Sequence, residues 1–316
     1  MRYLYYFCVF FLLLSCNKNN DKKDNPERNM KYDFDTNLEI STTSIELDEI
    51  LNIQDWYIYD SLLICKNSFG EPFYYSFNLF NFQLNSSFGQ KGNGPKEWIS
   101  PQLVIGKNDL FIVDNQTKYI HKVDSVMTKM GKCKELLSIN YLQTYDYPIC
   151  SYLTYSPKET LIKLYNIEKD SIMNEITLVN NNYKERFAYN FKNKYLVTAY
   201  NRVERIVIYS IENNYKLSPT IILNGFLNES PEKYYYSDVV CDKNFFYLLS
   251  QKNVDFTNID GYSHIEVYDY SGNNIALLKL DILAKRMLID KINNRFLFLS
   301  QLDDKIHIGN IPVLKK

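Results

Sequence analysis

The sequence predicts an all-β fold, a six-bladed β-propeller with four-stranded antiparallel blades. The first observation is composition. Aromatic residues make up 16% of the 316 residues, including 28 Tyr and 19 Phe, and aromatic side chains favour the half-buried surfaces of strands. The second is a repeat of short apolar runs. The third is that no stretch of the sequence shows the 3.6-residue period of an amphipathic helix.

The apolar runs recur at a nearly constant spacing, and most of them follow a polar turn. They begin at residues 62, 110, 161, 195, 245 and 296, so four of the five gaps span 48 to 51 residues and one spans 34. Strand-like segments before and after each run give about four strands per unit. Four-stranded units of about 45 residues, repeated four to eight times, are typical of a β-propeller. The last unit is short of strands, and we expect Leu38–Thr42 to supply the missing one and so protect an exposed edge.

The N-terminus has the features of an export signal. Arg2 precedes an apolar run, Tyr3–Leu14, that is too short to span a bilayer comfortably. The run ends Leu13-Leu14-Ser15-Cys16 and resembles the bacterial lipobox. The resemblance implies that residues 1–15 are a lipoprotein signal peptide and that Cys16 carries a lipid anchor, which multiple acyl chains make stable. The alternatives are an ordinary secretory signal with an incidental cysteine, or a core strand.

Residues 16–37 are predicted to be a flexible tether, because they are polar, charged and nearly free of aliphatic side chains. The propeller domain is then predicted to span residues 38–316. No aspartate occupies either position after Cys16, where the sequence has Asn17 and Lys18. In enteric lipoproteins this argues against retention in the inner membrane. We therefore expect a cell-envelope protein that is lipid-anchored at the outer membrane, on its periplasmic side or at the cell surface.

One glycine-rich segment gives the chain its sharpest family resemblance. Phe88–Trp98 reads FGQKGNGPKEW and looks like the G-x-x-G-x-G-P-x-E-[FW] segment of the TolB-like six-bladed propeller lipoproteins common in Bacteroidota. The strand His264–Asp269 and the following Ser-Gly-Asn turn are similar to another element of that family. The resemblance implies a fold and an envelope location, but no activity and no catalytic residues. A phosphate cradle is the alternative for the glycines. Their order differs from the dinucleotide-binding order, so an inter-blade connection is favoured.

Charge and motifs exclude several functions. The net charge is −1, from 36 basic and 37 acidic residues, so the chain lacks the basic field of a nucleic-acid-binding protein, and we expect no nucleic-acid partner. The three histidines, His121, His264 and His307, show no metal-binding spacing, and no nucleophile elbow occurs. We therefore expect no cofactor, no catalytic residue and no metal site in the linear pattern. An axial metal site gathered from several blades would leave no such pattern.

Four cysteines remain after the predicted processing, and none has metal-binding spacing. An exported protein can form disulfides, and four cysteines allow three pairings. Small buried hydrophobic side chains are the favoured interpretation, and the pairing stays open. The four are Cys65, Cys133, Cys150 and Cys241.

Two classes of function follow. The favoured one is a binding or scaffolding module, a lipid-anchored propeller that presents one face to a glycan, a peptide or an envelope protein. The alternative is a metal-dependent hydrolase or lyase with an axial site in the propeller channel. A bound divalent cation would favour the enzyme, whereas co-purification with an envelope complex would favour the binding module.

The sequence also predicts which face binds. Strands in a blade alternate in direction, so loops between the second and third strands leave the same end as connections to the next blade. Gly89–Trp98, Asn224–Tyr234 and the long loop Gln251–Tyr262 belong to these two types. Aromatic side chains with mixed charge suit a glycan or a peptide. The alternative is that Trp98 is buried between blades and that the acidic side chains are merely solvated. The candidate binding residues are Lys91, Glu97, Trp98, Lys233, Tyr234, Asp255, Asp260 and Tyr262.

Overall fold

A computed structural model describes the chain from residue 26 to residue 314, with internal gaps. The gaps fall at residues 51, 69, 93, 95–96, 106–109, 118, 124–128, 133–141, 145–148, 156–159, 167–168, 170, 179–184, 191, 214–215, 226–232, 256–259 and 304. The predicted signal peptide, Cys16 and the first part of the predicted tether lie outside the described residues. The described part consists of strands and turns, and it holds no helix long and apolar enough to cross a membrane.

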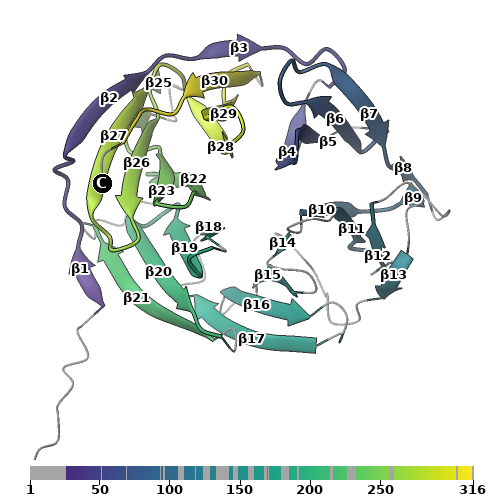
Figure 1. The fold of residues 1–316 in the computed structure, drawn as a ribbon, viewed down its shortest axis with the longest axis horizontal. Helices are drawn as coiled ribbons and strands as arrows, with labels where there is room; N and C mark the ends of the chain where they lie inside the picture. The colour runs from purple at the N-terminus through teal and green to yellow at the C-terminus, as the bar shows by residue number, and fades with distance from the viewer. Residues whose placement is uncertain are drawn as a thin grey trace, which may run out of the picture.

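The fold is an all-β propeller, as the sequence predicts. In the described residues, six sheets of four or five strands are arranged around a central axis (Figure 1), and two further sheets are short ribbons of two strands in loops. The first strand of each sheet lies toward the centre of the ring, and the later strands lie progressively farther out. Within each of the six sheets the strands from β4 (Ile53–Tyr59) onward pair antiparallel, whereas β1 (Glu27–Asn29) and β2 (Thr36–Ile40) pair in parallel with β21 (Leu217–Asn224) and β27 (Asn274–Leu280).

The first three sheets are each formed by four strands consecutive in the chain. Sheet 1 contains β4 (Ile53–Tyr59), β5 (Leu62–Asn67), β6 (Tyr74–Asn78) and β7 (Leu84–Phe88). Sheet 2 contains β10 (Pro101–Ile105), β11 (Leu110–Asp114), β12 (Tyr119–Lys122) and β13 (Lys129–Lys132). Sheet 3 contains β14 (Leu142–Thr144), β15 (Ile149–Tyr155), β16 (Thr160–Asn166) and β17 (Ser171–Leu178).

The other three sheets each include one strand from the N-terminal segment, and the two ribbons belong to loops. Sheet 4 contains β18 (Glu185–Asn190), β19 (Tyr195–Tyr200), β20 (Arg205–Ile211), β21 (Leu217–Asn224) and β1 (Glu27–Asn29). Sheet 5 contains β22 (Tyr236–Cys241), β23 (Phe245–Ser250), β26 (His264–Asp269), β27 (Asn274–Leu280) and β2 (Thr36–Ile40). Sheet 6 contains β28 (Ala284–Asp290), β29 (Arg295–Ser300), β30 (Ile306–Asn310) and β3 (Thr43–Ile45). The ribbons pair β8 (Gln90–Lys91) with β9 (Glu97–Trp98) and β24 (Val254–Asp255) with β25 (Asp260–Gly261).

The hydrophobic core lies between neighbouring sheets. Separate clusters of buried side chains fill the spaces between sheets 4 and 5, 5 and 6, and 6 and 1. A strand in the middle of a sheet is therefore covered on both faces, and every residue of β23 is buried. This explains why such strands appear in the sequence as continuous apolar runs instead of alternating patterns.

The strand that completes the last sheet lies slightly later than predicted. Thr43–Ile45 pairs with β30, whereas Leu38 and Ile40 belong to β2, which pairs in parallel with β27 as a fifth strand of sheet 5. The prediction that Leu38–Thr42 completes the last sheet is therefore wrong, because Leu38 and Ile40 belong to the neighbouring sheet and the completing strand begins at Thr43. The physical reason is that Leu38 and Ile40 pack into the core between sheets 5 and 6.

The folded region also begins earlier than residue 38. Glu27–Asn29 pairs in parallel with β21, and the side chain of Met30 is buried in the core between sheets 4 and 5. The predicted boundary between tether and propeller therefore moves from residue 38 to residue 26 at the latest. The composition of β1 did not reveal this, because its three side chains are all exposed and it is held by main-chain hydrogen bonds.

Candidate functional site

One end of the ring carries the loops that the sequence marked as binding loops. Arg286 contacts both Asp55 and Asp238, and each of these residues is the third residue of the first strand of its sheet. The starts of β4, β22 and β28 therefore lie at the same end. Because strands alternate, Gly89–Trp98 after β7 and Gln251–Tyr262 after β23 leave the ring at this end too. We call this end the loop face.

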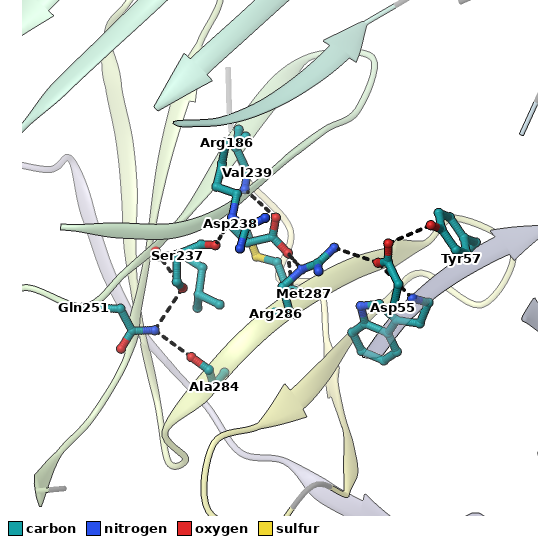
Figure 2. Close-up of polar contacts among 12 residues, drawn as sticks. Asp55, Tyr57, Arg186, Ser237, Asp238, Val239, Gln251, Ala284, Arg286 and Met287 are labelled. Atoms are coloured by element: carbon teal, nitrogen blue, oxygen red, sulfur yellow. Dashed lines mark hydrogen bonds and ion pairs between the residues drawn. The ribbon is translucent and has the colours of Figure 1, made fainter. Parts of the chain in front are cut away.

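A group of charged side chains from the first strands of the sheets lies at the loop face, and we call it the first-strand cluster. Figure 2 shows Arg286 between the carboxylates of Asp238 and Asp55, with Arg186 on the far side of Asp238. Four sheets contribute: β4, β18, β22 and β28 each supply one of these four residues.

Arg286 joins three sheets at the centre of the cluster. Its Nε donates to Asp238 Oδ2 at 3.0 Å, and its Nη2 donates to Asp55 Oδ1 at 3.2 Å. Tyr57 donates to the other oxygen of Asp55 at 2.6 Å, and the Arg186 Nε donates to the Ser237 carbonyl at 3.0 Å. The fork of the guanidinium is suited to holding two acceptors at once.

The backbone aims these side chains by a repeated irregularity. The pairing between the first and second strands shifts by one residue directly before Asp55, Asp238 and Arg286, in three neighbouring sheets. A β-bulge of this kind bends the strand and redirects the side chain that follows it. Figure 2 shows that the redirected side chains meet one another.

Burial makes the cluster sensitive to its charge balance. The side chain of Asp238 is 6% exposed, whereas those of Arg286 and Asp55 are 15% and 25% exposed. The backbone N–H groups of Val239 and Met287 also donate to the Asp238 carboxylate. Asp238 is therefore the buried member, and Asp55 and Arg286 retain access to solvent. Such a mixed surface offers both donors and acceptors to a polar ligand.

The predicted binding residues of the first loop serve the loop itself. Trp98 is fully buried in the core cluster that joins sheets 1 and 2. The Glu97 carboxylate accepts the Gly94 N–H at 2.9 Å and fills the space beside Gly92, where a Cβ would come within 2.0 Å of the carboxylate. Lys91 lies in the same ribbon and is exposed. For Trp98 the buried alternative holds, and the candidate binding role assigned to it is wrong.

The other predicted residues lie in two further loops of the same face. Lys233 is exposed, and Tyr234 is half-buried beneath Arg202, whose guanidinium lies 3.7 Å from the ring centroid. Asp255 and Asp260 pair across the β24–β25 ribbon. Tyr262 is 38% exposed and lies beside His264 and under the Lys279 ammonium. The structure thus places these residues on one face but in separate loops.

Sequence reasoning missed the first-strand cluster. Its members stand inside strands, not in the loops that were searched. A usable signal exists, because four first strands carry a polar pair within their first three residues: Gln54-Asp55, Glu185-Arg186, Ser237-Asp238 and Lys285-Arg286. A search for this pair one strand before each apolar run would have found the cluster.

The described histidine, cysteine and acidic side chains form no group of three or more that could hold a metal ion. Cys65 and Cys241 are free thiols. Burial raises the pKa of both thiols, that of Cys241 to about 12. Cys133 lies outside the described residues, and for Cys150 only its place in β15 is described.

Comparisons with known proteins support the fold. No family model matches the chain, and no curated protein matches it in sequence. The β-propeller domain of Cps50 (Swd1) from Myceliophteria thermophila matches with a TM-score of 0.56 and 8% identity, over 86% of this chain and 100% of that one. The WD40 domain of Pan2 from Neurospora crassa matches with 0.53 and 7%, over 88% and 96%. A member of the DUF4221 family from Bacteroides vulgatus matches with 0.54 and 10%, over 88% and 99%. At these identities the likeness shows the β-propeller fold alone.

Proposed function

We propose that the protein is a lipid-anchored envelope propeller that binds a partner through its loop face. In this proposal each of the six sheets is one blade of a closed six-bladed ring, related to the TolB-like propeller lipoproteins. The supporting features are the lipobox ending in Cys16, the glycine-rich Phe88–Trp98 segment and the six sheets around one axis. The Bacteroides structure that shares the fold is compatible with such an origin.

The first-strand cluster carries the proposal. Both signs of charge meet at the loop face, since Arg286 bridges two carboxylates from neighbouring sheets while keeping partial exposure. Exposed aromatic and basic groups lie in the loops of the same face, among them Tyr262 and Lys233. Donors, acceptors and aromatic surfaces together suit a glycan or a peptide segment, and aromatic residues are favoured at binding hot spots. An envelope protein that presents such a segment is the proposed partner.

The experiment compares the two faces of the ring with one chemical change. Lys233 is exposed on the loop face, and Lys243 is exposed in the β22–β23 turn on the opposite face. Tagged full-length wild type, Lys233→Glu and Lys243→Glu are expressed in the native host, cross-linked in membranes and purified, and the recovered proteins are quantified. We expect wild type and Lys243→Glu to recover the same partner and Lys233→Glu to lose most of it. Loss with Lys243→Glu alone would place the binding surface on the opposite face.

A further inference from the structure

The N-terminal segment runs along the outside of three sheets before the chain enters the ring. We call residues 26–45 the strap. Its strands β1, β2 and β3 lie on the outer edges of sheets 4, 5 and 6 in turn (Figure 1). The Ile222 N–H donates to Pro26 O and the Met30 N–H donates to Asn224 O, both at 2.8 Å. The strap is therefore an outer layer, and each of its strands is added to the outer edge of a sheet formed by later parts of the chain.

Between β1 and β2 the strap meets a buried group of charges. The Tyr32 hydroxyl donates to Glu204 Oε2 at 2.7 Å. The Lys252 ammonium lies 2.5 Å from Glu204 Oε1 and 2.7 Å from Glu266 Oε1, and it lies near the rings of Tyr32 and Tyr236. Lys252 thus connects the residue that holds the strap to the interior of sheet 5.

The charged groups of Glu204, Glu266 and Lys252 are closely packed and hydrogen-bonded. The side chains of Glu204 and Glu266 are 7% and 5% exposed, and a Cβ at Gly225 would come within 2.1 Å of Glu204 Oε2. Tyr236 and Tyr268 both donate to Glu266. Burial alone would lower the pKa of the Lys252 ammonium, but Glu266 and Glu204 outweigh it and the pKa is raised. The ammonium therefore stays charged and balances the buried carboxylates.

The rest of this stretch of the strap buries little apolar surface. All three side chains of β1 are exposed, and the Tyr32 ring is 43% exposed. Met30 is buried, and Phe34 contacts the Tyr268 ring edge-on at 5.7 Å. Main-chain pairing of β1 with β21 and hydrogen bonds from the Asn274 side chain to the carbonyls of Lys31 and Asp33 also hold the stretch. A segment with so little buried apolar surface opens locally at low cost, and the hydrogen bond from Tyr32 is the contact that ties it to a buried charged group.

Glu204 and Lys252 both come from the loop face. Glu204 ends the connection from β19 to β20, and Lys252 follows β23, so each belongs to a loop between the second and third strands of its sheet. The Tyr235 N–H donates to Asn201 O, and the Gln251 N–H donates to Tyr235 O. These loops are therefore joined to one another as well as to the strap.

We propose that Tyr32, Glu204 and Lys252 form a clasp by which the loop face holds the strap against the ring. A ligand that draws Lys252 or Glu204 toward the loop face opens the clasp and frees residues 26–34. The nine freed residues extend the connection to the N-terminus by about 30 Å, at the reach of an extended chain. This last consequence rests on the proposed lipid anchor, whereas the clasp itself does not.

Trypsin cleavage measures whether the strap is docked, because Arg28 and Lys31 lie within it. Their side chains are exposed, but the paired backbone of the docked strap is not free to enter the protease. Cleavage after these two residues is followed by mass spectrometry on the folded full-length chain. We expect Tyr32→Phe to be cleaved about tenfold faster than wild type, since it removes only the hydrogen bond to a charged group. Tyr75→Phe is the matched control, a hydroxyl loss in β6 of sheet 1, a sheet with which no strap strand pairs, and should be cleaved at the wild-type rate.

A second variant tests the link to the loop face. Lys252→Met removes the ammonium and is expected to speed cleavage at the same two sites at least as much as Tyr32→Phe, with the other sites read as a check on global unfolding. Equal rates for wild type and Tyr32→Phe would overturn the clasp. Faster cleavage in Tyr32→Phe with an unchanged rate in Lys252→Met would overturn the coupling to the loop face. Membrane fractionation of Cys16→Ser separately tests the anchor.

Discussion

His264 lies buried beside the long loop of sheet 5, and its surroundings oppose a positive charge. Its ring centroid lies 4.7 Å from that of Tyr262, and its Nδ1 lies 3.3 Å from the side-chain nitrogen of Asn253. Burial lowers the pKa of His264 most, and Lys279 and Lys252 lower it further, against the opposing effect of Glu266. The neutral form is therefore favoured in the folded protein.

This pKa shift makes stability depend on pH. The unfolded chain takes up a proton on His264 near its ordinary pKa of 6.5, whereas the folded chain does so only at lower pH. The stability that comes from keeping His264 neutral is fully present above the unfolded pKa of 6.5. It is lost as the pH falls from that value through the lowered pKa of the folded protein. We expect the urea concentration at the unfolding midpoint to fall as the pH is lowered from about 7.5 to about 5.5. The midpoint of the His264→Gln variant should fall less over the same range. An equal fall in both chains would show that other groups cause it.

At the scale of single residues, the sequence identified which residue types stand in the loops but not whether their side chains point outward or inward. Trp98 and Glu97 stand in the loop that was predicted to bind, yet Trp98 is fully buried and Glu97 caps the loop. A loop position does not state whether a side chain turns outward, since that depends on sheets formed by distant residues. The same limit hid Asp238, whose partner Arg286 is 48 residues away.

At the scale of elements, Arg286 fastens three first strands together. Arg286→Met would leave the 6%-exposed Asp238 without its partner charge, and we expect a loss of about 3 to 5 kcal/mol of unfolding free energy. Asp55→Asn should cost less, because Asp55 is more exposed. Urea unfolding measures both. Lys285→Met removes the same charge from the neighbouring position of β28 and is the control; an equal loss there would contradict a specific role for Arg286.

The apolar runs predicted one strand of each sheet well. Runs beginning at residues 62, 110, 195 and 245 coincide with the first residues of β5, β11, β19 and β23. These are second strands, covered on both faces by neighbouring sheets, so burial alone makes them continuous. Four of the first strands carry a polar pair within their first three residues, and β1 is entirely exposed, so these strands do not appear as continuous apolar runs.

The short gap of 34 residues has a specific origin. The run at residue 161 lies in β16, which is the third strand of sheet 3, whereas the other runs lie in second strands. The second strand of that sheet is β15, which begins at Ile149, and the spacing to the neighbouring sheets is then 39 and 46 residues. The strand β15 mixes apolar and polar residues, so it does not appear in the sequence as an apolar run.

At the scale of the whole molecule, the anchor and the ring are predicted to be separable. Cys16 lies ten residues before the first described residue, and every contact described for the ring is made by residues from position 26 onward. We expect Cys16→Ser to move the protein from the membrane fraction to the soluble fraction with an unchanged thermal unfolding midpoint. Retention of the variant in membranes after an alkaline wash would show that something other than the lipid holds it.

The path of the strap has a consequence for the order of folding. Thr42 contacts Asp281 and His307, at separations of 239 and 265 residues along the chain. A ribosome releases the strap first, but its pairing partners β21, β27 and β30 emerge much later. Contacts of such long sequence separation form slowly, because a large loop must close before they stabilise anything. We therefore expect the first folded segment of the chain to be the last to dock, and chains truncated before β30 to keep residues 43–45 unpaired.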